Sequence, residues 1–309
     1  MGDGVAILRL FREAIGDKEN TDDNKIPEPV SQTFTMWCHR IIMNIIAIIG
    51  APAALVKMFI RPIDSNEINP KILSGKKVVN WLYESDNDNN APLLSTVKLL
   101  RRRFNGARFS NILLAAVSKS LKDFLERKNC KVPKNMTVVI PARMYDPYEK
   151  MSLKIENKFS VAMQTIPIDV ENTMDRLSQI KRYSDKLKAS PDYQVIYWSM
   201  SYITGVFPES IFKILFKKKH CTISVSNIPG PDSTIKIDTF ILENVGFFLP
   251  NIGSTACGIT LLSYNGKFHF GIMSDVVAIE NDEDLSEILN GIVNEINVMA
   301  VVYLNGEHL

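Results

Sequence analysis

The sequence predicts a mixed α/β fold, in which strand-like and helix-like segments alternate along most of the chain. The clearest strand covers residues 222–231, where the β-branched residues of TISVSNI lead into a rigid Pro-Gly-Pro turn. The clearest hairpin joins residues 257–264 to residues 267–274 through Asn265-Gly266, a pair that tolerates positive φ. Long segments with helical periodicity lie on both sides of these strands. Together these observations predict mixed sheets flanked by helices.

Helical periodicity is found in three segments, residues 110–128, 170–189 and 282–304. In each of them apolar residues recur three or four positions apart, which places them on one face of a helix. Two further strand-like runs, residues 137–141 and 159–168, lie between the first and the second of these helices. The same alternation of strands and helices therefore begins well before residue 222.

A polar segment and a basic cluster lie shortly before the first helix. Residues 63–92 are expected to form an irregular connection. Ser110 is expected to cap the helix that follows it. Residues 101–103, which are all arginine, form a basic cluster with Arg108. We interpret this cluster either as a solvated turn or as a contact for phosphate or acidic headgroups.

Composition excludes several classes of protein. With 309 residues the chain is long enough for two domains or for one large one. Its 36 basic and 34 acidic residues leave a net charge of +2, so no global field favours nucleic acid as a partner. The four cysteines lie far apart, which argues against a zinc module and against a disulfide framework. The four histidines form no pair at metal-ligand spacing, so no metal site is predicted.

Two apolar stretches indicate affinity for a lipid surface. Residues 41–56 contain no charge, but they are fewer than the roughly 20 residues needed to cross a bilayer. A buried or interfacial helix and a true membrane span both remain open, and the lack of a strong second span favours lying on the membrane. Residues 195–216 are rich in aromatic and aliphatic residues and precede three lysines, which suits a helix on the surface near anionic headgroups.

Several blocks of sequence together resemble one protein family. Residues 226–231, Ser-Asn-Ile-Pro-Gly-Pro, are followed by a spaced pattern from Gly258 to Asp275 and by the helix of residues 285–299. Upstream blocks at residues 110–117, 139–141 and 156–159 occur in the same order as in that family. The combination resembles the wax ester synthase/diacylglycerol acyltransferase family, the WSD-type O-acyltransferases.

The resemblance implies a chloramphenicol-acetyltransferase-like, CoA-dependent acyltransferase fold with two domains and a tunnel between them. It also implies a His-His-x-x-x-Asp-Gly motif, whose second histidine is the general base for the acceptor alcohol. Asp3 and Gly4 match the end of this motif, where the aspartate braces the loop. The two histidines would fall before Met1, so we expect an incomplete N-terminal half-domain. The arginine usual after the Pro-containing strand is displaced, since Arg143 comes earlier and Tyr145 stands near the usual position.

The expected binding residues lie in the strand that ends in Pro-Gly-Pro. They are Ser226, Asn227, Pro229 and Gly230. The resemblance also suggests four segments: a remnant of the catalytic-motif helix, a membrane-associating segment with a linker, the rest of the N-terminal acyltransferase domain with its crossover, and the C-terminal domain. These segments cover residues 1–30, 31–92, 93–168 and 169–309 in that order.

The function implied by the resemblance is O-acyl transfer from acyl-CoA to a long-chain alcohol or diacylglycerol. Acyl-CoA is then a substrate, and no cofactor or metal is expected. We expect the chain as written to be inactive, because the catalytic histidines are absent from it. The alternative is a catalytically dead protein that binds lipid or acyl-CoA on the same scaffold. The expected location is the cytosolic face of the endoplasmic reticulum or plasma membrane, with no nucleic-acid partner.

Overall fold

The computed structural model describes most of the chain from residue 60 onwards and single residues before it. The described residues are 38, 41, 42, 45, 48–50, 52, 53, 56, 60–70, 72–84, 92–104, 106–144, 159–198, 220–250 and 255–305.

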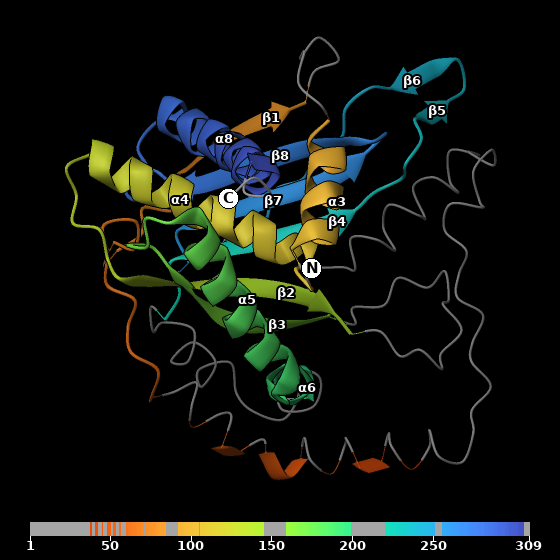
Figure 1. The fold of residues 1–309 in the computed structure, drawn as a ribbon. Helices are drawn as coiled ribbons and strands as arrows, with labels where there is room; N and C mark the ends of the chain where they lie inside the picture. The colour runs from red at the N-terminus through yellow and green to blue at the C-terminus, as the bar shows by residue number, and fades with distance from the viewer. Residues whose placement is uncertain are drawn as a thin grey trace.

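A six-stranded mixed sheet forms the centre of the molecule, with the strand order β1-β8-β7-β4-β2-β3 (Figure 1). The strands β2 and β4 pair in parallel, as do β4 and β7, and the other neighbours are antiparallel. The strands of this sheet are β1 (Lys77–Tyr83), β2 (Asn135–Arg143), β3 (Phe159–Pro167), β4 (Ile223–Pro229), β7 (Cys257–Tyr264) and β8 (Lys267–Asp275). A separate small hairpin consists of β5 (Ile235–Ile237) and β6 (Phe240–Leu242).

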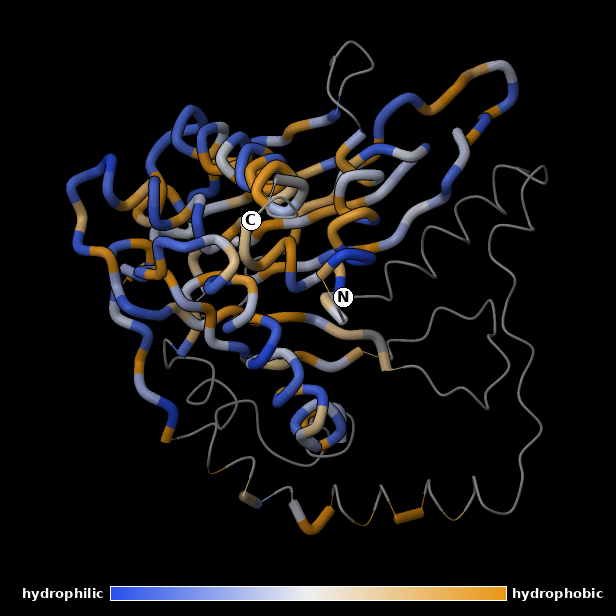
Figure 2. The backbone as a smooth tube through the Cα atoms, viewed as in Figure 1, coloured by the Kyte–Doolittle hydropathy of each residue, from blue (hydrophilic) through white to orange (hydrophobic). Residues whose placement is uncertain are grey.

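Four helices cover one face of this sheet (Figure 1). They are α3 (Leu93–Arg103), α4 (Phe109–Arg127), α5 (Thr173–Ala189) and α8 (Asp282–Asn305), and the short helix α6 (Asp192–Trp198) lies near β3. Apolar side chains of the strands and helices meet in a single core between them. Figure 2 colours the backbone of these elements orange where the residues are hydrophobic. Among the described residues, α8 is the one helix long and apolar enough to span a membrane, but it packs on α4, α3 and β1.

The predicted strands and helices are largely confirmed. The hairpin between β7 and β8 turns through Asn265 and Gly266, whose φ values are 48° and 75°. The strand before the Pro-Gly-Pro turn ends at Pro229, as expected. The helices α4, α5 and α8 begin and end within a few residues of the predicted limits. The turn chemistry and the apolar periodicity were therefore sufficient to find these elements.

Two expectations were wrong. Residues 63–92 are not an irregular connection throughout, because β1 lies within them and pairs antiparallel with β8. Ser110 does not cap α4, since the helix begins one residue earlier at Phe109. The backbone N–H of Arg108 instead donates to the side chain of Asn111, at 2.8 Å. The side-chain amide of Asn111 thus satisfies a backbone N–H at the start of the helix, a role expected of the Ser110 hydroxyl.

The sheet also unites strands that are far apart in the sequence. The predicted segments 31–92, 93–168 and 169–309 each contribute strands to it. The division of the chain into those segments remains a prediction.

Candidate functional site

The predicted binding residues lie at the C-terminal end of β4, on both faces of the sheet. Ser226 is buried, whereas Asn227 and Pro229 are exposed. Successive side chains of a strand point to opposite faces. Val225 belongs to the core beneath the helices, so Asn227 shares the helix-covered face and Ser226 points to the other one. The structure therefore brings the four residues to one strand end without gathering their side chains on one surface.

Gly230 lies where the backbone after β4 comes very close to the backbone of β7. A Cβ atom at this position would lie 2.2 Å from the carbonyl oxygen of Ser263, which no side chain can tolerate. The Gly230 N–H also donates to the Ser263 hydroxyl, at 3.2 Å. Because β4 and β7 are parallel here, this contact fixes the turn beyond β4 directly against the end of β7. Its role in the described structure is to hold the strand end.

His269 occupies the same end of the sheet, two strands away from β4. The pairing registers align Ile228 with Leu262 and Leu262 with His269, and they align His269 with Tyr83 of β1. The imidazole lies between two aromatic rings, with its centroid 4.8 Å from that of Tyr83 and 5.7 Å from that of Tyr264. Ile228, Leu262, His269 and Tyr83 thus form a row across the helix-free face of the sheet, at the end where the Pro-Gly-Pro turn begins.

The His269 side chain holds the loop that follows the β5–β6 hairpin. Its Nδ1 lies 2.7 Å from the carbonyl oxygen of Val245, to which it can donate. Its Nε2 is buried and has no hydrogen-bond partner among the described residues. Burial lowers the pKa of His269, and the hydrogen bond with Val245 opposes this shift only partly. The His269 ring is therefore uncharged at neutral pH, and its hydrogen bond with Val245 holds the loop against the sheet.

Two more side chains fasten the same region to the helix-free face. The Thr260 hydroxyl donates to the carbonyl oxygen of Phe247. The Tyr264 hydroxyl accepts a hydrogen bond from the N–H of Ile235 at 2.8 Å and donates to the carbonyl oxygen of Leu242. The hairpin and the loop after it are thus fixed by hydrogen bonds to buried side chains of β7 and β8.

Asp275 organises the opposite end of the sheet. Its side chain is 0% exposed and forms an ion pair with Lys77, at 3.2 Å. It also accepts hydrogen bonds from the N–H and hydroxyl of Ser74 and from the N–H of Gly75 and of Val277. Burial alone would raise the pKa of Asp275, but these hydrogen bonds outweigh burial and bring the pKa below its ordinary value. This aspartate of the family pattern therefore anchors β1 to β8.

A second carboxylate ties the segment before β1 to the sheet. Asp64 accepts hydrogen bonds from the N–H of Thr137 and the hydroxyl of Thr222, both at 2.6 Å. Arg61 donates to the hydroxyl of Thr165 on the edge strand β3, at 3.2 Å. Burial raises the pKa of Asp64, and the hydrogen bonds from Thr222 and Thr137 offset part of that rise. The segment therefore crosses the starts of β2 and β4.

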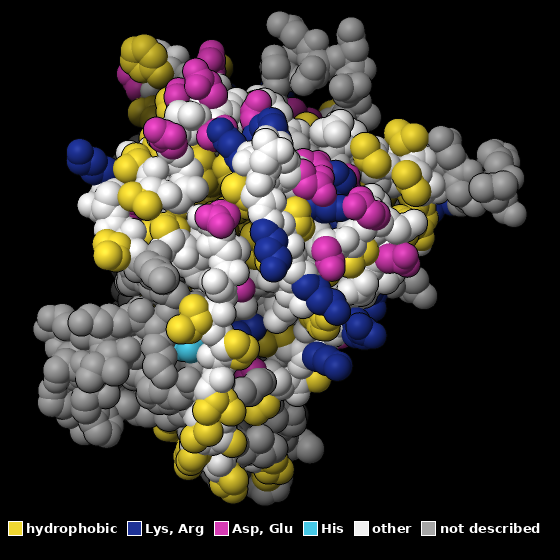
Figure 3. Space-filling view, turned by 90° about the vertical axis from the view of Figure 1, so that its left-hand side faces the viewer, with side chains coloured by type: hydrophobic (Ala, Val, Ile, Leu, Met, Phe, Trp, Pro, Cys, Tyr) yellow, Lys and Arg dark blue, Asp and Glu magenta, His cyan; other side chains and the backbone are white. Residues whose placement is uncertain are grey.

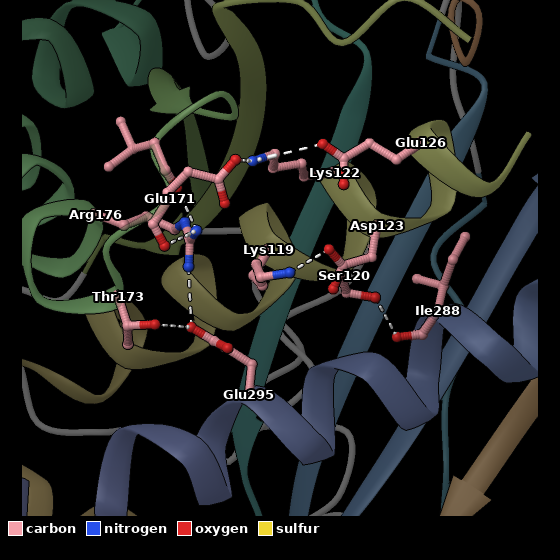
Figure 4. Close-up of polar contacts among 11 residues, drawn as sticks. Lys119, Ser120, Lys122, Asp123, Glu126, Glu171, Thr173, Arg176, Ile288 and Glu295 are labelled. Carbon is pink, nitrogen blue, oxygen red and sulfur yellow. Dashed lines mark hydrogen bonds and ion pairs between the residues drawn. The ribbon is translucent and has the colours of Figure 1, made fainter. Parts of the chain in front are cut away.

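On the helix-covered face, charged residues join α4, α5 and α8 (Figure 4). Arg176 of α5 forms an ion pair with Glu295 of α8 at 2.9 Å, and their side chains are 0% and 5% exposed. The Thr173 hydroxyl donates to the same carboxylate, at 2.8 Å. In α4, Lys122 forms an ion pair with Glu171 just before α5. These contacts fix the relative positions of the helices.

The described histidines and the two cysteines in or next to the central sheet strands are poorly placed to act as a base or a nucleophile. His220 and His269 are only 6% and 1% exposed. Burial raises the pKa of Cys221 and of Cys257 to about 12, so both thiols stay protonated at neutral pH. No group of three or more possible metal ligands occurs within the described part of the chain.

Several predictions for the site lie outside the described residues. They concern Asp3, Gly4, Tyr145 and the side chain of Arg143. The sequence analysis did not single out Arg176 or Glu295, although each lies on the apolar side of its helix. A charged residue at such a position, as Glu295 is between Ile292 and Ile296, is the signal that could have revealed the pair.

Residues 155–299 match the family model of the WS/DGAT C-terminal domain. No curated protein matches the chain significantly.

Solved structures show a similar fold at low sequence identity. The wax ester synthase/diacylglycerol acyltransferase from Marinobacter aquaeolei VT8 shares 16% identity, with a TM-score of 0.53 over 84% of this chain. The chain spans 57% of the length of that protein. The epimerization domain from the third module of tyrocidine synthetase B shares 10% identity, with a TM-score of 0.56, and 98% of this chain and 67% of that one are covered.

The first condensation domain of the CDA synthetase is also similar, with 10% identity and a TM-score of 0.53. There the match covers 97% of this chain and 61% of the other. These likenesses confirm the chloramphenicol-acetyltransferase-like fold that the sequence predicted. Residues 155–299 are thus a WS/DGAT C-terminal domain, a domain of the wax ester synthase/diacylglycerol acyltransferase family, and the chain as a whole shares the fold of these acyltransferases.

Proposed function

We propose that this protein serves O-acyl transfer from a fatty acyl-CoA to a long-chain alcohol or a diacylglycerol. The products would be a wax ester or a triacylglycerol, with free CoA as the leaving thiol. The match of residues 155–299 to the WS/DGAT C-terminal domain is the observation that carries the proposal. In this proposal acyl-CoA is a substrate, and the reaction needs no metal or further cofactor.

Ester formation requires a base that removes the proton of the acceptor hydroxyl. The two described histidines are too deeply buried to reach an alcohol, and the Cys221 and Cys257 thiols stay protonated. By resemblance, Asp3 and Gly4 end a motif whose histidine pair has no counterpart among the four histidines of the sequence. We therefore propose that the 309-residue chain supplies the scaffold and the binding surfaces, and that turnover requires the histidine pair.

An ester-formation assay tests this proposal. The purified chain is incubated with radiolabelled palmitoyl-CoA and either hexadecanol or dioleoylglycerol, with and without a His-His segment placed before Met1. We expect labelled ester only from the version that carries the histidines. Ester formation by the chain alone would refute the role given to the missing pair, and no ester from either version would refute the enzymatic proposal.

The second candidate is a catalytically inactive protein that binds acyl-CoA or lipid on the same scaffold. The burial of both described histidines favours it. Calorimetry with palmitoyl-CoA separates the two candidates when it is combined with the assay. Binding together with no ester from either version would support the inactive binder, and no binding would exclude it.

We also propose that the protein lies on a membrane surface at the cytosolic face of the endoplasmic reticulum or plasma membrane. The described apolar residues of the segment 41–60 are helical and solvent-exposed, with Ile49 and Ile60 73% and 74% exposed. Hydrophobic side chains gather at the lower end of the molecule in Figure 3, where Figure 1 draws this segment. Most of the exposed members share one helical face, while Ile42 lies beside it. The members on this face are Ile41, Ile45, Ile48, Ile49, Pro52 and Val56.

Vesicle sedimentation tests the membrane proposal. The double variant I45N/I49N removes two exposed isoleucines from the apolar face, and we expect its vesicle binding to fall at least about tenfold. Ile72 is 80% exposed but lies outside this helical face, so I72N is the matched control. Equal losses in both variants, or no loss in the double variant, would contradict the proposed contact.

A further inference from the structure

A groove lies between the end of α3 and the C-terminal half of α5. It has a volume of about 560 Å³ and is open to solvent. Phe104, at the end of α3, forms one wall, and the other lining side chains come from α5. They include Ser178, Lys181, Arg182, Asp185 and Lys186. A groove of this volume is in the range of sites that hold a nucleotide-sized ligand.

The charge of the groove is predominantly positive. Asp185 is paired twice, with Lys181 at 2.9 Å and with Arg108 at 2.7 Å. The hydrogen bond from Lys181 keeps the pKa of Asp185 below its ordinary value, so this carboxylate is ionised and already compensated. Arg182 and Lys186 add two exposed cations, and neither has an ion-pair partner among the described residues. The groove therefore has positive charge left over for an anion.

The turn between α3 and α4 holds the wall of the groove in place. A Cβ atom at Gly106 would lie 3.4 Å from Cε of Lys181, so the turn passes directly over that side chain. The ring of Phe104 packs edge-on against Tyr303 of α8, with their centroids 6.0 Å apart. This contact orients an aromatic wall beside the cations. A flat base can stack on such a ring while its phosphates contact the cations.

We propose that this basic groove binds the phosphorylated nucleotide portion of a CoA thioester. The assignment rests on the proposed acyl-CoA-dependent function. Arginine suits phosphate because its planar guanidinium donates two parallel hydrogen bonds, and lysine adds a mobile point charge. The base stacks on Phe104, and the phosphates lie towards Arg182 and Lys186. The acyl chain and its thioester then lie outside the groove.

Calorimetry with adenosine 3′,5′-bisphosphate and the full chain tests the site without any need for turnover. We expect the double variant R182A/K186A to bind it at least about tenfold more weakly than the wild type, since each cation lost removes a charge-assisted contact. The single variant K186A is compared with K188A, because Lys188 is exposed on the same helix but does not line the groove. Circular dichroism and the melting temperature verify that the variants are folded.

Other probes identify the chemistry that is bound. Adenosine should bind far more weakly than its 3′,5′-bisphosphate, and inorganic phosphate should compete only at much higher concentration. Binding of the bisphosphate that is equal in wild type and R182A/K186A, or an equal loss in K186A and K188A, would overturn the proposal. It would also be overturned if phosphatidylserine vesicles, rather than the bisphosphate, depended on these residues.

The two proposals can fail separately. If the version with the histidine pair forms ester and R182A/K186A leaves its KM for palmitoyl-CoA unchanged, the groove assignment fails while the enzymatic function stands. If the bisphosphate binds as expected but no version forms ester, the function fails while the groove assignment stands.

Discussion

Removal of the Glu295 carboxylate tests how far the packing of α8 depends on its buried ion pair with α5. Both side chains are almost fully buried, so neither charge regains water when its partner is lost. In the variant E295L, the Arg176 guanidinium keeps the carbonyl oxygens of Val170 and Glu171 as acceptors but loses its ion-pair partner. Removing one partner of a buried pair costs about 3–5 kcal/mol. Because two acceptors remain, we expect the lower end, about 3 kcal/mol.

Urea unfolding, followed by circular dichroism, measures this loss. The double variant R176M/E295L should be more stable than E295L, because it leaves no unpaired charge in the core. The exposed pair of Arg127 and Glu287 provides the matched control, since both side chains are about half exposed. The variant E287Q should cost less than about 1 kcal/mol. If E295L costs no more than E287Q, the ion pair does not stabilise the helix packing and the argument from burial is wrong.

Three further predictions follow from the strand ends. The variant G230A should lower the free energy of unfolding by more than about 2 kcal/mol, because its methyl group would overlap the neighbouring carbonyl. The comparison is G50A, where the added methyl group would make only an ordinary contact, at 3.8 Å from Cγ of Pro191. The folded-state pKa of His269 is lowered, so its contribution to stability is present above about pH 6.5 and is lost as the pH falls below that value. H269F should flatten the pH dependence of the free energy of unfolding. An unchanged dependence would contradict the role given to His269. D275N should cost about 3 kcal/mol at pH 7 and clearly less at pH 2, since the pKa of Asp275 is lowered in the folded state and its contribution declines as the pH falls below about 4 towards that lowered pKa. An equal cost at both pH values would show that its charge is unimportant.

Local chemistry explains which elements could be predicted. The hairpin between β7 and β8 depends on two adjacent residues with positive φ, and those residues are readable in the sequence. The strand β1 was missed because its pairing partner β8 lies nearly two hundred residues further along. Its edge position also leaves Trp81 54% exposed, so its apolar residues do not mark a buried face. Edge strands depend on their neighbour more than on their own composition.

The sequence by itself determined the elements and the family pattern, because periodicity and turn residues act over a few positions. Only the tertiary structure decided which polar groups share a site. Asp275 contacts Ser74 and Lys77, and Arg176 contacts Glu295. In each contact the two residues are more than a hundred positions apart in the sequence. The basic groove likewise exists only because the α3–α4 turn lies against α5. Such contacts form where packing removes water from charged groups, and that removal depends on the whole fold rather than on neighbouring residues.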